Sequence, residues 1–319
     1  MEIKIRPSQL LGVVFLTIAL AAIFVYVPVL SLFSPLIAVT YVLVGAKNNA
    51  KLTVQAVIIT FLMLWVSVDI SYALNICITF MLPGILIGKM INTSFKDKNA
   101  DKLVPIFWGS IIFIISTIIY FLIVHFAFKI DLMSGITKLI EEQIKAMDME
   151  SSNLIFKNIK GMESISADEV MNYFLNFMPI WLIAQNIMYS FIVYYLSIFT
   201  INKINKEKLE SAKFTEIFLP GHAVWALIFM YISILILDVA GIKMNKEQVI
   251  LNLFFAFAVL FLIQAISLYA YYLKNISKNG LIVCVLLLVL FIAGILGATV
   301  IGMFDCVLDF RKVKSNKST

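Results

Sequence analysis

Nine long apolar runs separated by short basic connectors make up almost the whole of this 319-residue chain. Several runs exceed 18 residues without a charge, which is enough for a helix to cross roughly 30 Å of hydrocarbon. A membrane-spanning segment must satisfy its own backbone polar groups, so it is a helix or a strand of a closed barrel. Barrel strands alternate polar and apolar residues, and these runs do not. The sequence therefore predicts an all-α, polytopic transmembrane helix bundle of about eight or nine spans.

The predicted spans can be placed by residue number. They cover 9–29, 31–45, 52–68, 70–91, 104–128, 173–201, 222–240, 248–273 and 280–303. Hydrophobic residues form 62% of the chain, which leaves little material for a soluble domain. The first span has a basic start that resembles a secretory signal, but its apolar run continues through Leu30, so we expect an uncleaved span.

Lys and Arg residues near the span ends predict the orientation in the membrane. With the N-terminus inside, fourteen of these residues face the cytoplasm and six face outward when the long segment 129–172 is set aside. The positive-inside rule therefore predicts a multi-pass plasma-membrane protein with a cytoplasmic N-terminus. One conflict remains, because nine spans would place the basic residues 311–317 outside. Either this segment is an exception to the rule or one span is assigned wrongly.

Three regions follow from this pattern. Residues 1–205 form a six-span membrane core with an outer polar loop at 129–172, residues 206–304 add three spans, and residues 305–319 form a short basic tail. Ser166 and Glu169 have the spacing of a capping box, which predicts that a helix starts there and runs into the sixth span. The loop 129–172 is expected either to lie on the membrane surface or to cover an outward-facing site as a lid.

Neutral polar side chains inside the spans are the candidate substrate-binding residues. Gln185 and Asn186 lie at the centre of the sixth predicted span, Gln264 at the centre of the eighth, and Asn75 near the outer end of the fourth. Such amides commonly join neighbouring helices by hydrogen bonds, each worth about 0.6 kcal/mol. The alternative is that they line a site for a polar solute, and the sequence leaves both interpretations open.

Ionisable residues are confined to the ends of the spans. Asp69, His125 and Asp238 are predicted near outer ends, where they form either a polar mouth or ordinary solvated helix ends. No charge lies near the middle of a span, which argues against a proton pump built on a mid-membrane carboxylate. The sequence has no catalytic motif and no metal-ligand spacing. We therefore expect no enzyme activity, no catalytic residues, no metal and no cofactor, and a basic stripe typical of nucleic-acid binding is missing as well.

Small residues at four-residue spacing predict close helix packing in two places. Gly84 and Gly88 lie in the fourth predicted span, and Gly294, Ala298 and Gly302 lie in the ninth. This spacing lets two helix backbones approach each other, so it indicates packing and not chemistry.

Four sequence stretches resemble the YybS-like family of uncharacterised bacterial membrane proteins. They are Gly45-Ala-Lys-Asn-Asn-Ala-Lys51, Leu82-Pro-Gly-Ile-Leu-Ile-Gly88, Leu219-Pro-Gly-His-Ala-Val-Trp225, and the ending Gly302-Met-Phe-Asp305 with Asp309-Phe-Arg-Lys312. The last of these is the most distinctive, and the resemblance covers nearly the whole chain. It implies a membrane protein and brings no established activity.

Residues 1–205 are also similar to the substrate-binding components of energy-coupling-factor vitamin transporters. That resemblance implies six spans that capture a micronutrient from outside and depend on a separate ATPase module. The chain departs from this family by its three additional spans, and it has no Walker A motif of its own.

Two hypotheses for the function follow. The first is a transporter-like integral membrane protein that binds a small solute from its outer face and lacks its own energy source, so that an ATPase or another membrane protein would be its partner. The second is a non-transporting scaffold or regulatory subunit of a membrane complex, which would dock through residues 92–103 and 202–219. On either hypothesis the lipid bilayer surrounds the protein.

Overall fold

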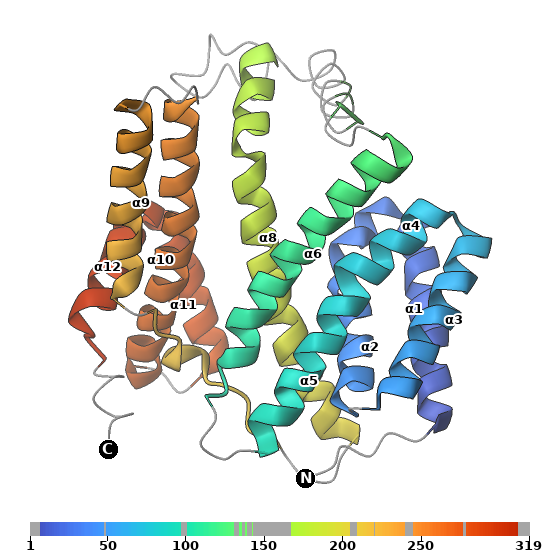
Figure 1. Cartoon of the computed structure of the whole chain (residues 1–319). Coiled ribbons are helices and arrows are strands. Elements are labelled where there is room, and N and C mark those ends of the chain that lie inside the picture. The colour runs from blue at the N-terminus through green and yellow to red at the C-terminus, as the bar shows by residue number, and fades with distance from the viewer. Residues whose placement is uncertain are drawn as a thin grey trace. The chain divides into compact units, whose positions relative to one another are not determined.

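The structure is a computed structural model. It describes residues 7–47, 49–96, 101–130, 134–135, 138, 142, 167–204, 209–219, 221–239, 245–276 and 279–311. Within these residues all regular structure is helical (Figure 1), as the sequence predicts. Most of the loop predicted at 129–172 lies outside the described residues.

Five described helices are long and apolar enough to cross a membrane. They are Ala50–Ser67, Ile70–Lys96, Val104–Phe128, Leu175–Ile204 and Lys246–Lys274. Shorter apolar helices cover Leu11–Tyr26, Leu30–Ala46, His222–Asp238 and Ile295–Leu308. Each of the nine overlaps one of the predicted apolar runs, while the total of eight or nine membrane crossings stays a prediction.

The chain divides into two compact units. Unit 1 comprises Met1–Leu175 and Gln185–Ser211, and unit 2 comprises Asn176–Ala184 and Ala212–Thr319. One helix, α8 (Ala167–Ile204), contributes residues to both. The described part of this helix begins at Ala167, and Ser166 of the predicted capping box lies outside the described residues, so that helix start stays a prediction.

Unit 1 contains the N-terminal helices. These are α1 (Pro7–Tyr26), the 3₁₀ helix η1 (Pro28–Phe33), α2 (Pro35–Ala46), α3 (Ala50–Ser67), α4 (Ile70–Asn75), the π-helix η2 (Ile76–Met81), α5 (Leu82–Lys96) and α6 (Val104–Phe128). Polar side chains mark two of the starts, because Asn49 accepts from the backbone N–H of Leu52 and Asp69 accepts from that of Tyr72. Such side chains satisfy N–H groups that a helix leaves unpaired in its first turn.

Helices α2 and α5 pack with their backbones in contact. A Cβ atom on Gly84 would collide with the carbonyl of Ala38, and one on Gly88 with the carbonyl of Val42. Both partner numbers increase together, so the two helices run parallel. This contact confirms the close packing predicted from the spacing of Gly84 and Gly88.

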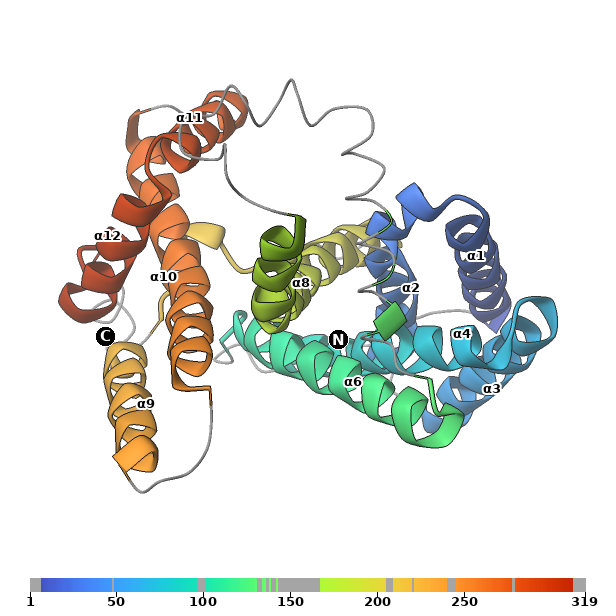
Figure 2. The same ribbon diagram turned by 90° about the horizontal axis from the view of Figure 1, so that it is seen from above.

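Unit 2 is built around one long helix. Helix α10 (Lys246–Ile276) packs against α9 (His222–Val239), α11 (Gly280–Ala293) and α12 (Ile295–Leu308), as Figure 2 shows from above. The short 3₁₀ helix η3 (Phe214–Glu216) lies in the segment before α9. The single span predicted at 280–303 is wrong in one respect, because the chain breaks at Gly294 and forms two helices of 14 residues each.

Candidate functional site

Three aromatic rings meet where η2, α6 and α8 contact one another in unit 1. The ring of Tyr189 lies 5.9 Å from that of Phe80 and 6.1 Å from that of Phe113, measured between centroids. All three side chains are buried. They form an apolar layer inside the unit, which we call the aromatic layer.

The directions of the helices around the aromatic layer can be read from their contacts. Along α6, Ile106 contacts Ser190, Phe113 contacts Tyr189, and Thr117 contacts Asn186. The partner numbers fall as the α6 numbers rise, so α6 and α8 run antiparallel. Gly109 of α6 lies against Ile87 of α5 while Phe113 and Phe80 both contact Tyr189, so α6 is also antiparallel to the η2–α5 segment.

Three of the four predicted amides, Asn75, Gln185 and Asn186, lie about one helical turn from the aromatic layer, all on the same side of it. Thr117 donates to Asn186 at 3.1 Å, Thr79 donates to Asn75 at 2.9 Å, and Gln185 donates to the hydroxyl of Tyr189. Because α6 opposes the other two helices, Thr117, Asn75 and the α8 amides come to one depth. We call the residues Asn75, Thr117, Gln185 and Asn186 the polar layer.

Two of these amides retain hydrogen-bonding capacity. Among the described residues, no donor reaches the carbonyl oxygen of Gln185 and no acceptor reaches the side-chain nitrogen of Asn75. The side chain of Gln185 is exposed, that of Asn75 is half-buried and that of Asn186 is buried. In hydrocarbon an unmet polar group costs free energy, so the polar layer is suited to contact with water or with a polar molecule.

A π-helical segment supports this arrangement. Pro83 has no N–H to offer the carbonyl four residues earlier, and the preceding residues Ile76–Met81 form a π-helix. Single π-turns inside α-helices occur frequently at functional sites. The sequence pattern predicted neither this segment nor roles for Thr117, Phe80, Phe113 and Tyr189, although Pro83 inside an apolar run was a usable signal.

Two of the three predicted mouth residues belong to unit 1. Asp69 caps the start of α4, six residues before Asn75, and His125 lies in the last turn of α6, eight residues after Thr117. At 1.5 Å per residue they stand about 9 and 12 Å from the polar layer, on the side away from the aromatic layer. Both side chains are exposed.

Asp238 does not join them within that unit. It lies at the end of α9 in unit 2 and forms an exposed ion pair with Lys246 at 2.7 Å. Among the described residues, no group of three His, Cys, Asp or Glu side chains is placed to hold a metal ion.

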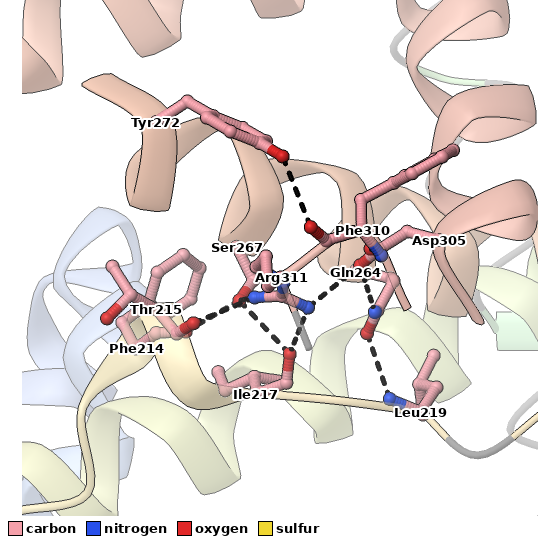
Figure 3. Close-up of polar contacts among 10 residues, drawn as sticks. All are labelled: Phe214, Thr215, Ile217, Leu219, Gln264, Ser267, Tyr272, Asp305, Phe310 and Arg311. Atoms are coloured by element: carbon pink, nitrogen blue, oxygen red, sulfur yellow. Dashed lines mark hydrogen bonds and ion pairs between the residues drawn. The ribbon is translucent and has the colours of Figure 1, made fainter. Parts of the chain in front are cut away.

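Gln264 also belongs to unit 2, where it is completely buried in a second polar cluster (Figure 3). Its carbonyl oxygen accepts from the backbone N–H of Leu219 at 2.9 Å, and its amide nitrogen donates to Asp305 at 2.6 Å. Asp305 pairs with Arg311 at 2.9 Å, and both charged side chains are fully buried. We call Gln264, Ser267, Asp305 and Arg311 the charged network.

Arg311 connects the charged network to the segment that precedes α9. It donates to the backbone carbonyls of Thr215 and Ile217, each at 2.8 Å, and to the hydroxyl of Ser267 at 2.6 Å (Figure 3). Its remaining nitrogen, Nε, is buried without a hydrogen bond. Asp305 and Arg311 were predicted to lie in a short basic tail, whereas both are buried. The signal was the distinctive ending that contains these two residues.

Comparison with known proteins places the chain in a family. The model of the family described as predicted membrane protein (DUF2232) matches residues 15–306, so the chain belongs to this family. No curated protein and no solved structure matches the chain. The YybS-like assignment and the likeness of residues 1–205 to vitamin-transporter components are not confirmed by this match and stay predictions.

Proposed function

We propose that this member of the DUF2232 family binds a small solute in the polar layer of unit 1. The protein itself is an integral membrane protein with several apolar helices. The observation that carries the proposal is the position of Asn75, Thr117, Gln185 and Asn186 at one depth, directly beside a layer of aromatic rings. The two amides with spare hydrogen-bonding capacity would contact the solute.

The chemistry of the two layers defines the class of solute. The amide oxygen of Gln185 accepts a hydrogen bond and the amide nitrogen of Asn75 donates one. The aromatic layer next to them is apolar and buried, with its rings tilted or edge-on to one another. The hydrogen bonds described for the polar layer join neutral side chains. A small neutral solute with both polar groups and an apolar face fits this set.

The side of entry follows from Asp69 and His125. Both lie beyond the polar layer, on the side away from the aromatic layer. The distribution of Lys and Arg favours an outward-facing position for this end of the helices. We therefore propose uptake of the solute from outside, with residues 129–172 as a covering segment.

Transport against a gradient would require a partner. The chain has no phosphate-binding Gly-rich loop, and Asp305, the carboxylate beside the mid-span residue Gln264, is fully buried and paired with Arg311. We therefore propose that the chain is neither an enzyme nor an autonomous pump. Residues 92–103 and 202–213 would contact an ATPase or another membrane protein, whereas residues 214–219 of the predicted docking segment are held by the charged network. Purified protein in liposomes is expected to show no accumulation with ATP or with a proton gradient, and active uptake without a partner would refute this part of the proposal.

Binding can be tested by thermal unfolding in detergent with a panel of neutral sugars, amides, nucleosides and uncharged aromatic vitamins. At least one compound class should stabilise the wild-type protein, and Gln185→Leu and Asn75→Leu should each remove that stabilisation. Thr17→Val is the matched control, because the partners of the Thr17 hydroxyl within the described part of the chain are Val13 and Thr40, the latter on α2, in a buried helix contact. Equal stabilisation of all four proteins by a compound would reject the polar layer as its site.

The exposure of Gln185 supports the alternative hypothesis of a scaffold or regulatory subunit. An exposed amide on a membrane helix can also pair with a helix of another protein. In that case the panel would give no stabilisation, and Gln185→Leu would instead weaken co-purification of a membrane partner.

A further inference from the structure

The direction of α12 determines where the chain goes after its last helix. A Cβ atom on Gly302 would collide with the carbonyl of Phe261, Asp305 contacts Gln264, and Phe310 contacts Tyr272. The partner numbers on α10 increase along α12, so the two helices run in the same direction. The C-terminal end of α12 therefore lies toward the C-terminal end of α10.

Contacts with the segment before α9 give the same result independently. A Cβ atom on Gly221 would lie 3.1 Å from the carbonyl oxygen of Cys306. Arg311 bonds to the carbonyls of Thr215 and Ile217. The described chain therefore ends beside residues 214–219, at the end of unit 2 where α9 begins. Helix α11 begins at Gly280, four residues after the end of α10, at that same end.

Neither α11 nor α12 is long enough to be an ordinary span. Each has 14 residues, which corresponds to about 21 Å against a hydrocarbon core of roughly 30 Å. The chain reverses at Gly294, where nothing lies within 4 Å of an added Cβ atom. We propose that α11 and α12 form a re-entrant hairpin that enters and leaves the membrane on the side of residues 214–219, with Arg311 as the residue that positions it.

Arg311 has a specific physical task in this arrangement. Residues 217–219 are not helical, yet they lie beside Gln264 and Ser267, which precede the end of α10 by 12 and 9 residues. At 1.5 Å per residue, these two side chains lie about 13 to 18 Å from the end of α10. The non-helical segment beside them therefore needs internal partners for its backbone groups. Arg311 and Ser267 donate to its carbonyls, Gln264 accepts from its N–H, and Asp305 compensates the charge of Arg311.

The hairpin also resolves the conflict in the distribution of basic residues. A single span at 280–303 would place Lys312, Lys314 and Lys317 on the outer side. With a re-entrant hairpin, the chain after Arg311 lies on the same side of the membrane as Lys213 and Lys274. Only Lys243 and Lys246 then remain on the opposite side among the basic residues outside 129–172, as the positive-inside rule favours.

Cysteine labelling in intact cells tests the hairpin directly. Single cysteines at Ser315, Ser211 and Asn245 would be compared in a cysteine-free protein, using a membrane-impermeant maleimide before and after permeabilisation. The cysteine at Ser315 should label like the one at Ser211 and opposite to the one at Asn245. Labelling of Ser315 together with Asn245 would overturn the hairpin, and this result does not depend on any change to the charged network.

Limited trypsin digestion tests the role of Arg311 separately. In the wild-type protein the segment after Lys213 is fixed by the charged network, whereas Arg311→Leu should make cleavage after Lys213 several-fold faster in the purified protein. Arg311→Lys keeps the charge but loses the paired donors, so it should give an intermediate rate. Lys246→Ala is the control and should cleave at the wild-type rate. A wild-type rate for Arg311→Leu would overturn the positioning role.

Discussion

The charged network of unit 2 and the polar layer of unit 1 differ in how fully their polar side chains are hydrogen-bonded within the protein. Both place polar side chains in strongly apolar surroundings. In unit 2, Gln264, Asp305 and Arg311 are bonded to one another and to the backbone of residues 215–219, and all are buried. In unit 1, Gln185 and Asn75 each have one described protein partner and keep capacity for another.

The difference separates a structural role from a binding role. Charges in an apolar interior are tolerated only when each is paired and hydrogen-bonded, and a network that is nearly complete has no further partner to take. Leaving a neutral amide incompletely hydrogen-bonded costs less free energy than leaving a charge unpaired. Such an amide can therefore keep a free donor or acceptor for a solute. The charged side chains of unit 2 therefore stabilise the fold, and the neutral amides of unit 1 are the candidates for binding.

The largest effect is expected from breaking the charged network. Arg311→Leu leaves Asp305 as an unpaired buried charge and removes the donors to Thr215 and Ile217, which should lower the free energy of unfolding by about 3–5 kcal/mol. The double variant Asp305→Leu/Arg311→Leu removes the stranded charge and should recover part of this loss. Unfolding in mixed micelles gives both values. If Arg311→Leu lowered the free energy of unfolding by no more than a surface substitution does, the structural role of the charged network would be contradicted.

A smaller loss is expected where α12 contacts α10 through Gly302. Gly302→Leu forces the two backbones apart and should destabilise the protein by about 1–3 kcal/mol. Gly297→Leu on the same helix is the matched control, because nothing lies within 4 Å of a Cβ atom there. The same unfolding titration distinguishes them, and equal losses would mean that the α10–α12 contact is not close-packed.

The amides of the polar layer should matter little for stability. Gln185→Leu removes one side-chain hydrogen bond, an interaction worth about 0.6 kcal/mol in membrane proteins, while it abolishes stabilisation by a bound solute. Thermal unfolding with and without the stabilising compound measures both effects on one sample. A large loss of stability without any loss of binding would assign Gln185 to the fold and not to the site.

The smallest effect is expected at the exposed ion pair between Lys246 and Asp238. Ion pairs in contact with solvent contribute little because water and salt screen them. Lys246→Ala should leave the unfolding midpoint unchanged at physiological salt. A midpoint shift comparable to that of Arg311→Leu would show that burial is not what separates the two ion pairs.

Sequence patterns predicted much of the fold because the membrane imposes simple rules on them. Long apolar runs predicted the helices, and Gly84 with Gly88 predicted a close contact between two of them. The break at Gly294 was missed because the apolar run continues through it. A hydropathy pattern shows that a segment lies in an apolar environment. It does not show where the chain reverses its direction within that environment.

The candidate site was predicted in part. The amides were found because polar residues in apolar runs are conspicuous, but their partners Thr117 and Tyr189 look like ordinary span residues. Arg311 was assigned to a tail because it follows the last apolar run, and only its contact with residues 215 and 217 shows otherwise. Long-range contacts between helices decide such roles, and one sequence does not contain them in a readable form.

One labelling experiment tests the contrast between the polar layer, where Gln185 is exposed, and the charged network, which is buried. Gln185→Cys would be introduced into a protein in which Cys77 and Cys284 are replaced by Ala, which leaves the native Cys306 buried beside the charged network. A small, charged, water-soluble thiol reagent would be added to the folded protein, and mass spectrometry would quantify each site. We predict that the cysteine at position 185 is modified while Cys306 is protected. Modification of Cys306 with protection of position 185 would contradict the account.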